Sequence, residues 1–153
     1  MQGSELYLGE FDHALDNQCR VTLPSDWRNR DGGTELVLIP AREGALVLLP
    51  LATFMAFVND AKKLAIANPK MQMAFARLGA LSRRCRCDKQ GRIALDRKML
   101  DGIGVSGQIK LIGALTHIRL CAPQNWRPSE NGAGLDSCLD EIQKVSDGLT
   151  ELH

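Results

Sequence analysis

The amino-acid sequence predicts a β-rich α+β fold in which two pseudo-symmetric halves form one domain. A motif supports this prediction: residues 16–24 return 72 residues later as residues 88–96, and both copies read Asp, three residues, Arg, an aliphatic residue, one residue and Leu. Two apolar runs, 35–39 and 46–48, also return in the same order, as 108–112 and 118–120. Two copies are too few for a solenoid, so we expect one domain closed around a two-fold axis.

The first half is expected to contain short strands, a short helix and a hairpin. Residues 6–11 and 20–24 resemble strands, and Ser25 is a candidate N-cap for a helix that Gly32-Gly33 would end. The apolar runs 36–39 and 45–49 are separated by Pro, Arg, Glu and Gly, which is typical of a hairpin.

Two helices are expected to separate the halves. Phe54, Val58, Ala61 and Ala65 recur at near-helical spacing within residues 51–67. Asn68-Pro69 would end that helix, and residues 70–82 predict a second helix.

The second half repeats the pattern more clearly. In a strand over residues 84–87, the two arginines face one way and the two cysteines the other, so the cysteines are expected to be buried. Residues 88–91 form the turn, where Gly91 permits a positive φ. Asp96 is a candidate cap for a helix over 97–101, and residues 109–112 and 118–121 predict the second hairpin.

These elements predict the domain organisation. Residues 1–126 would form a single domain of two repeats, about 6–54 and 80–126, joined by a helical pair over 51–82. Residues 127–153 would form an acidic tail with a weaker helical pattern over 135–149. The 153 residues, 44% hydrophobic and 24% charged, fit one globular domain.

Charge is unevenly distributed although the formal net charge is only +1. Residues 77–98 hold eight Lys or Arg and two Asp, whereas residues 124–153 hold two basic and six acidic residues. A basic centre with an acidic tail is typical of a protein with an anionic partner, and ordinary solvated surface is the alternative.

The sequence is that expected of a cytoplasmic protein. The five cysteines are odd in number and show no disulfide framework, which suits a reducing compartment. We also find no signal-peptide pattern and no apolar stretch near the roughly 18 residues of a membrane helix, so no membrane partner is expected.

The repeated Asp-x-x-x-Arg turns are the candidate functional sites. Asp16 and Asp88 can accept backbone N–H bonds, and an arginine four residues later can close the loop as an ion pair, so each turn has a purely structural explanation. The alternative is that the loops display charge for phosphate or guanine contacts. On that hypothesis Asp16, Asp88 and Gly91 shape the turns, and the DNA-binding residues are Arg20, Arg84, Arg86, Lys89 and Arg92.

The same residues resemble the MraZ family. The resemblance rests on Leu8-Gly9-Glu10-Phe11-Asp12-His13-Ala14-Leu15-Asp16 with Arg20 to Pro24, on Cys87 to Leu95, and on Gly113, Pro123 and Trp126 at intact spacing. It implies a double-split β-barrel of the swapped-hairpin type, related to AbrB-like DNA-binding domains. It also implies a nucleoid-associated bacterial transcriptional regulator of the division and cell-wall gene cluster, including its own promoter. A ring-shaped homo-oligomer would bind repeated promoter sites with avidity.

This sequence departs from the family pattern in both motifs. The first motif has Asn17-Gln18-Cys19 where Lys and Gly usually precede the arginine, which removes a positive charge and a flexible residue. The second motif ends in Asp96 where the family usually has Pro, and Arg83, Arg84 and Arg86 make its approach more basic. These departures weaken the first turn as a DNA contact and favour the second.

No pattern of enzyme chemistry is visible. Cys85-x-Cys87 lacks a second pair of zinc ligands, His13 lacks a nucleophile partner, and Cys19 is better explained as a replacement for Gly than as a redox sensor. We therefore expect no catalytic residues, metal, cofactor or small-molecule substrate. The rival hypothesis is an oligomeric protein-interaction module that keeps the fold but has lost or altered DNA binding.

Overall fold

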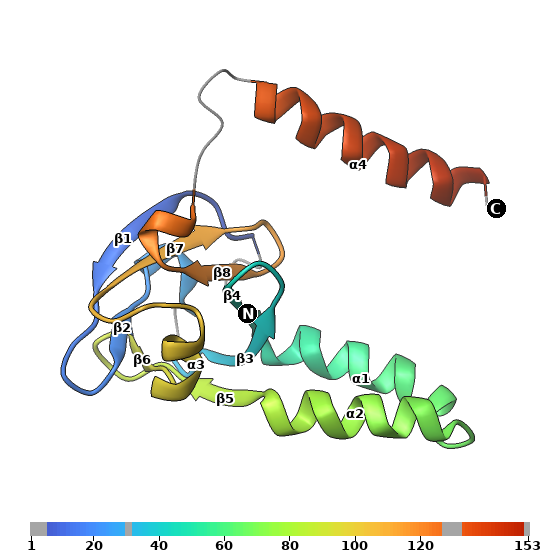
Figure 1. The fold of residues 1–153 in the computed structure, drawn as a ribbon, viewed down its shortest axis with the longest axis horizontal. Coiled ribbons are helices and arrows are strands. Elements are labelled where there is room, and N and C mark those ends of the chain that lie inside the picture. The colour runs from blue at the N-terminus through green and yellow to red at the C-terminus, as the bar shows by residue number, and fades with distance from the viewer. Residues whose placement is uncertain (1–5, 30–31, 127–132, 152–153) are drawn as a thin grey trace.

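The β-strands form one large sheet and one small ribbon (Figure 1). The computed structural model describes residues 6–29, 32–126 and 133–151. A six-stranded antiparallel sheet has the order β1-β7-β8-β4-β3-β5, and β2 pairs with β6 in the ribbon. The strands are β1 (Glu10–Ala14), β2 (Arg20–Thr22), β3 (Glu35–Ala41), β4 (Ala45–Pro50), β5 (Arg83–Arg86), β6 (Arg92–Ala94), β7 (Gln108–Gly113) and β8 (Ile118–Cys121).

The predicted β-rich α+β class is confirmed, and the two halves exchange strands. The first strand of each half pairs with the hairpin of the other: β1 lies beside β7, and β5 lies beside β3. The predicted closure into a swapped-hairpin barrel is not confirmed. Among the described residues the large sheet has free edges at β1 and β5, and the β2–β6 ribbon is hydrogen-bonded as a separate sheet.

Strand register shows the pseudo-two-fold symmetry of the chain. In the ribbon Val21 pairs with Ile93, its counterpart 72 residues later. The residue pairs on either side of this central pair are equivalent to each other under the same 72-residue offset. In the large sheet β4 and β8 pair antiparallel, with Val47 opposite Arg119, again 72 residues apart. Both pairs therefore lie where a two-fold axis would relate the halves.

Aliphatic side chains from both halves fill the core between the sheet and the ribbon. The two central ribbon residues, Val21 and Ile93, contribute, as do side chains of the central strands such as Leu38, Leu48 and Leu120. The chain has only seven aromatic residues, and Trp27 packs edge-on against Tyr7 and Phe11 beside this core. Burial of strand side chains from both repeats makes the described β-body one packing unit.

A helical hairpin projects from the β-body (Figure 1). It consists of α1 (Leu51–Ala65) and α2 (Pro69–Leu81), close to the two predicted helices. The side chain of Asn68 accepts the backbone N–H groups of Lys70 and Met71, and Pro69 occupies the first helical turn, so the Asn-Pro pair begins α2 as well as ending α1.

Asp96 caps a short helix, as predicted. Its carboxylate accepts the backbone N–H of Met99 at 3.2 Å, at the start of α3 (Arg97–Gly102). Arg83 also pairs with Asp96, at 3.1 Å between Nε and Oδ2. The residue that departs from the family pattern therefore fastens β5 to α3.

Two local predictions in the first half are wrong. The first strand was expected over residues 6–11, but β1 is Glu10–Ala14, because residues 10–14 find the partner β7 whereas Tyr7 makes only an isolated bridge with Leu115. Ser25 does not cap a helix: it begins a 3-10 turn, η1 (Ser25–Trp27), whose N-cap Pro24 has no side-chain acceptor.

The chain ends in a further helix. A second 3-10 turn, η2 (Pro123–Asn125), follows β8, and α4 (Ala133–Glu151) coincides with the weak helical pattern in the tail. Within the described residues, no helix combines the length and apolar character needed to span a membrane.

Candidate nucleic-acid interface

The two Asp-x-x-x-Arg turns have the same hydrogen-bond pattern. Asp16 Oδ1 accepts the backbone N–H groups of Gln18 and Arg20, each at 2.9 Å, and its Oδ2 accepts Arg20 Nε at 2.7 Å. Asp88 likewise accepts the backbone N–H groups of Gln90 and Arg92 at 2.9 Å, with Arg92 Nε also at 2.9 Å from Oδ2. The motif therefore specifies a turn that ties itself together, which supports the structural explanation of Asp16 and Asp88.

Equivalent residues in the two turns adopt a left-handed backbone. Cys19 has φ +59° and Gly91 has φ +82°. The Cys19 carbonyl accepts the N–H of Leu95, and the Gly91 carbonyl accepts the N–H of Leu23, both at 2.9 Å. This reciprocal pair binds each turn to the opposite half, and the buried Cys19 side chain packs in the core in place of the family's glycine.

Replacing Gly91 with Ala is expected to destabilise the protein by about 1–2 kcal/mol, because an L-residue is strained at this φ. The added Cβ would also fall on the guanidinium of Arg28. Urea unfolding of Gly91→Ala, Arg28→Ala and the double variant separates these causes. We expect a smaller cost of Gly91→Ala in the Arg28→Ala background, and equal costs in both backgrounds would show that Arg28 does not restrict the turn.

Both turn carboxyls have a pKa below the usual range. The backbone N–H of Arg20 is the main cause for Asp16, and that of Arg92 for Asp88; the arginine side chains contribute further. The backbone N–H of Met99 similarly lowers the pKa of Asp96. A lowered pKa in the folded state means that these carboxylates stabilise the fold above the unfolded-state pKa of about 4.

Stability is therefore expected to fall as the pH drops below about 4 toward the lowered folded-state values, as the turn carboxylates become protonated. Thermal unfolding between pH 6 and pH 2.5 measures this loss. The Asp16→Asn/Asp88→Asn variant should have a lower melting temperature at pH 6 and a shallower decrease below pH 4. A decrease as steep as that of the parent protein would assign the acid sensitivity to other groups.

Ion pairs engage three of the five predicted DNA-binding side chains. Arg20 and Arg92 are held by the aspartates of their own turns, and Arg84 Nη2 lies 3.1 Å from both carboxylate oxygens of Glu35. Arg86 and Lys89 are exposed and form no ion pair within the described part of the chain.

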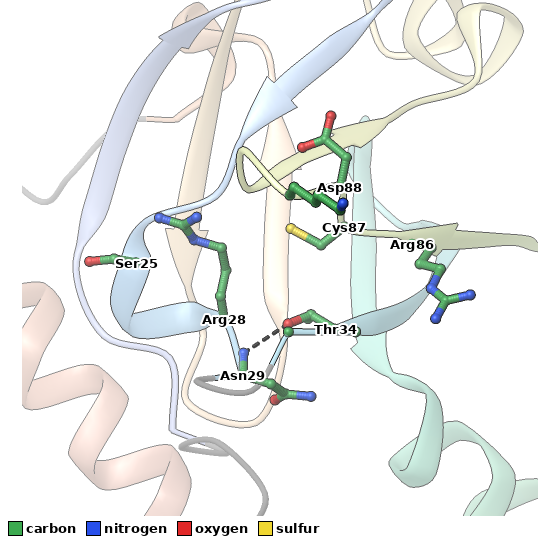
Figure 2. Close-up of a pocket in the computed structure, with 10 residues that line it drawn as sticks. Ser25, Arg28, Asn29, Thr34, Arg86, Cys87 and Asp88 are labelled. Atoms are coloured by element: carbon green, nitrogen blue, oxygen red, sulfur yellow. Dashed lines mark hydrogen bonds between the residues drawn. The ribbon is translucent and has the colours of Figure 1, made fainter.

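An open cavity of about 670 Å³ lies beside the second turn (Figure 2). Figure 2 shows Arg28 on one side, Arg86 on the other, and Cys87 and Asp88 between them. Nε of Arg28 is buried and has no hydrogen-bond partner among the described residues. The cavity is lined by Ser25, Arg28, Asn29, Gly32, Gly33, Thr34, Arg86, Cys87, Asp88 and Lys89.

The cavity has the character of an anion site. Arg28, Arg86 and Lys89 supply three positive charges, whereas the one lining carboxylate, Asp88, is already bound by Arg92. The Asn29 N–H donates to Thr34 Oγ1 at 2.8 Å, which fixes the loop below Arg28. Three cations that line one cavity, with no carboxylate partner among the described residues, suit phosphate oxygens.

The cysteines near this cavity are not activated thiols. Burial raises the pKa of Cys85 to about 11. Burial also raises the pKa of Cys87, although the nearby Arg28 opposes the shift. Among the described residues no three His, Cys, Asp or Glu side chains converge in a way that would hold a metal ion.

Arg28 is the cavity residue that sequence reasoning missed. It follows Trp27, whose buried ring anchors η1 in the core, so Arg28 is held against the second turn although 60 residues separate it from Asp88. The internal repeat did not point to Arg28 either, because the residue 72 positions later is Leu100 and not a second arginine.

Comparison with known proteins finds relatives along most of this chain. A family model described as "MraZ protein, putative antitoxin-like" matches residues 6–75. A Caldicellulosiruptor saccharolyticus protein named transcriptional regulator MraZ is 28% identical over 96% of this chain and 99% of its own length. Along nearly its whole length, this chain is similar to proteins of the MraZ family.

Other relatives of the same name also cover nearly all of the chain. The Clostridium acetobutylicum protein is 26% identical over 92% of this chain and 99% of its own length. The Corynebacterium jeikeium protein is 26% identical over 96% of each chain. The similarity to these MraZ proteins thus spans both repeats and extends into the tail.

Proposed function

We propose that this protein is a sequence-specific DNA-binding regulator of transcription and not an enzyme. The observation that carries the proposal is the group of Arg28, Arg86 and Lys89 around an open cavity, with no carboxylate partner among the described residues. Phosphate oxygens of a DNA backbone would complete this site. The relatives named transcriptional regulator MraZ support the same function.

The proposal extends to the cellular role. The protein would act in the cytoplasm, associated with the nucleoid, on the promoter of the division and cell-wall gene cluster that includes its own gene. Residues 1–126 would form the DNA-binding domain, with the exchanged strands arranged as a double-split barrel, and residues 127–153 would be an appended tail. A homo-oligomer would present several copies of the cavity to repeated DNA sites, which raises affinity through avidity.

A rival proposal is a protein-interaction module that has lost DNA binding. The observation that favours it is the engagement of Arg20, Arg84 and Arg92 by carboxylates of the same chain, which leaves the first turn without a free cation. On this proposal the Asp-x-x-x-Arg motifs have only their structural role.

Fluorescence anisotropy tests the two proposals. The DNA upstream of the protein's own gene and a scrambled duplex of equal length are titrated from 50 to 300 mM salt. Tighter binding to the upstream DNA, with affinity that falls steeply with salt, supports the regulator. Weak and equal binding to both duplexes at every salt concentration supports the interaction module.

A further inference from the structure

A second open cavity, of about 460 Å³, lies between α3, the β3–β4 hairpin and the end of α2. Its floor is apolar, because it is formed by Ala45, Leu46 and Ile103, each at most 9% exposed. Leu81 lies at its edge with 54% of the residue exposed, so a bound molecule would cover it. A volume of a few hundred Å³ with a mainly apolar lining is typical of small-ligand sites. We call this the α3 cavity.

Arg83, which lines the α3 cavity, occupies the same place in its half as Phe11 does in the first half. The two residues are 72 positions apart, each in the first strand of its half. Phe11 pairs with Leu111 of β7, and Arg83 pairs with Leu38 of β3, which lies 73 positions before Leu111. Strand pairing therefore makes Phe11 and Arg83 structural equivalents.

Trp27 and Met99 are a second equivalent pair. They are 72 positions apart, and each lies in the short helical segment that follows a ribbon strand. In the first half the buried ring of Trp27 packs edge-on against Phe11, with ring centroids 5.2 Å apart. In the second half the equivalent residues, Met99 and Arg83, line the α3 cavity. One half thus fills this place with two aromatic rings, whereas the other has a cavity there.

The charges that line the α3 cavity favour an anion. Both carboxylate oxygens of Asp96 are already used, because Oδ1 accepts the Met99 N–H at 3.2 Å and Oδ2 accepts Arg83 Nε at 3.1 Å. Lys98 also lines the cavity, is exposed, and forms no ion pair within the described ranges. The first half has Asp26 at the position equivalent to Lys98, so this positive charge belongs to the second half only. One uncompensated cation suits a ligand with a single negative charge.

We propose that the α3 cavity binds a small aromatic carboxylate. The ring of the ligand would take the place that Trp27 and Phe11 fill in the first half, and its carboxylate would pair with Lys98. The proposal concerns a non-covalently bound ligand and goes beyond DNA binding. Because the cavity is formed by three separate segments of the chain, the ligand would join them and stabilise the folded protein.

Isothermal titration calorimetry of the full chain with 2-naphthoate tests this proposal. Two control ligands separate the ring from the charge: 2-naphthylmethanol has the ring without the charge, and acetate has the carboxylate without the ring. We expect saturable binding of one 2-naphthoate per chain and no measurable binding of acetate. Binding of 2-naphthylmethanol should be about two- to fivefold weaker than that of 2-naphthoate, because it lacks one exposed ion pair.

Two variants test the position of the ring by filling the α3 cavity. Met99→Trp restores the ring of the first half, and Gly102→Leu adds a side chain at a lining position where an added Cβ meets no atom within 4 Å. Both should weaken 2-naphthoate binding about tenfold or more, because close packing leaves no room for the ligand ring. Far-UV circular dichroism checks the fold, and Gly102→Leu alone decides if the larger Trp prevents folding.

Met73→Trp and Gly107→Leu are the matched controls, because neither residue lines the α3 cavity. Met73 is exposed on α2, and an added Cβ at Gly107 also meets no atom within 4 Å. Both controls should keep the parent affinity. Lys98→Glu tests the charge: it should abolish the preference for 2-naphthoate over 2-naphthylmethanol and leave the affinity for the alcohol unchanged.

Three results would overturn the proposal. Parent-like affinity in folded Gly102→Leu would place the ring outside the α3 cavity, and an unchanged preference in Lys98→Glu would show that Lys98 does not select the carboxylate. Absence of 2-naphthoate binding, with a smaller molar mass of Gly102→Leu in light scattering, would assign the cavity to a contact with another protein chain. No DNA is present, so a protein that binds 2-naphthoate but not the upstream DNA contradicts only the proposed function.

Discussion

Replacing Arg28, Arg86 and Lys89 with glutamine is expected to weaken binding to the upstream DNA on the order of 100-fold near 0.1 M salt. Each cation that contacts a phosphate releases condensed counterions, so three lost contacts should also reduce the slope of log K against log salt by about 3. Arg28 is expected to contribute although it is partly buried, because a phosphate oxygen at the cavity would supply the hydrogen-bond acceptor that its Nε lacks among the described residues.

The matched control removes three other exposed charges by Arg42→Gln, Lys98→Gln and Lys144→Gln, none of which lines the cavity. Anisotropy titrations over the same salt series compare the two triple variants with the parent. Equal losses in both would mean that only overall charge matters, and an unchanged affinity for the first variant would exclude the cavity as the DNA contact.

Replacing Ile93 with alanine is expected to lower the free energy of unfolding by about 2–5 kcal/mol. Ile93 is fully buried and pairs with Val21 at the centre of the β2–β6 ribbon. A smaller side chain there removes packing that both repeats share. The ribbon cannot readily move to fill the space left by the side chain, because the backbone N–H groups of Leu23 and Leu95 are hydrogen-bonded across it to the opposite turns.

Urea denaturation measures this loss, and Thr22→Ala on the exposed side of β2 is the control within the same ribbon. The control is expected to change the stability by no more than about 0.5 kcal/mol. A loss below about 1 kcal/mol for Ile93→Ala would mean that the ribbon does not unfold together with the large sheet.

The repeat made much of this fold predictable from sequence. Because residues 16–24 and 88–96 share residue types in the same order, they adopt the same turns, and the structure pairs their centres at Val21 and Ile93. The helical pair followed from apolar spacing and from Asn68-Pro69, which starts the second helix as clearly as it ends the first.

The missed features depend on long-range pairing. Residues 6–11 have the composition of a strand, but β1 lies at 10–14 because its register is set by β7, a partner about a hundred residues away. Arg28 reaches the second turn only because Trp27 is buried, and no local pattern reports that contact. Local sequence likewise could not show that Arg84 is engaged by Glu35, 49 residues earlier in the chain.

The exchange of first strands has a consequence for synthesis of the protein on the ribosome. β1 emerges early, but its hydrogen-bonding partner β7 begins only at Gln108, so at about 5–20 residues per second the strand waits roughly 5–20 s for its partner. During that interval the polar backbone of β1 is open to other chains, including nascent copies of the same protein on one messenger RNA. Slowing translation before codon 108 should therefore increase aggregation of the new chains.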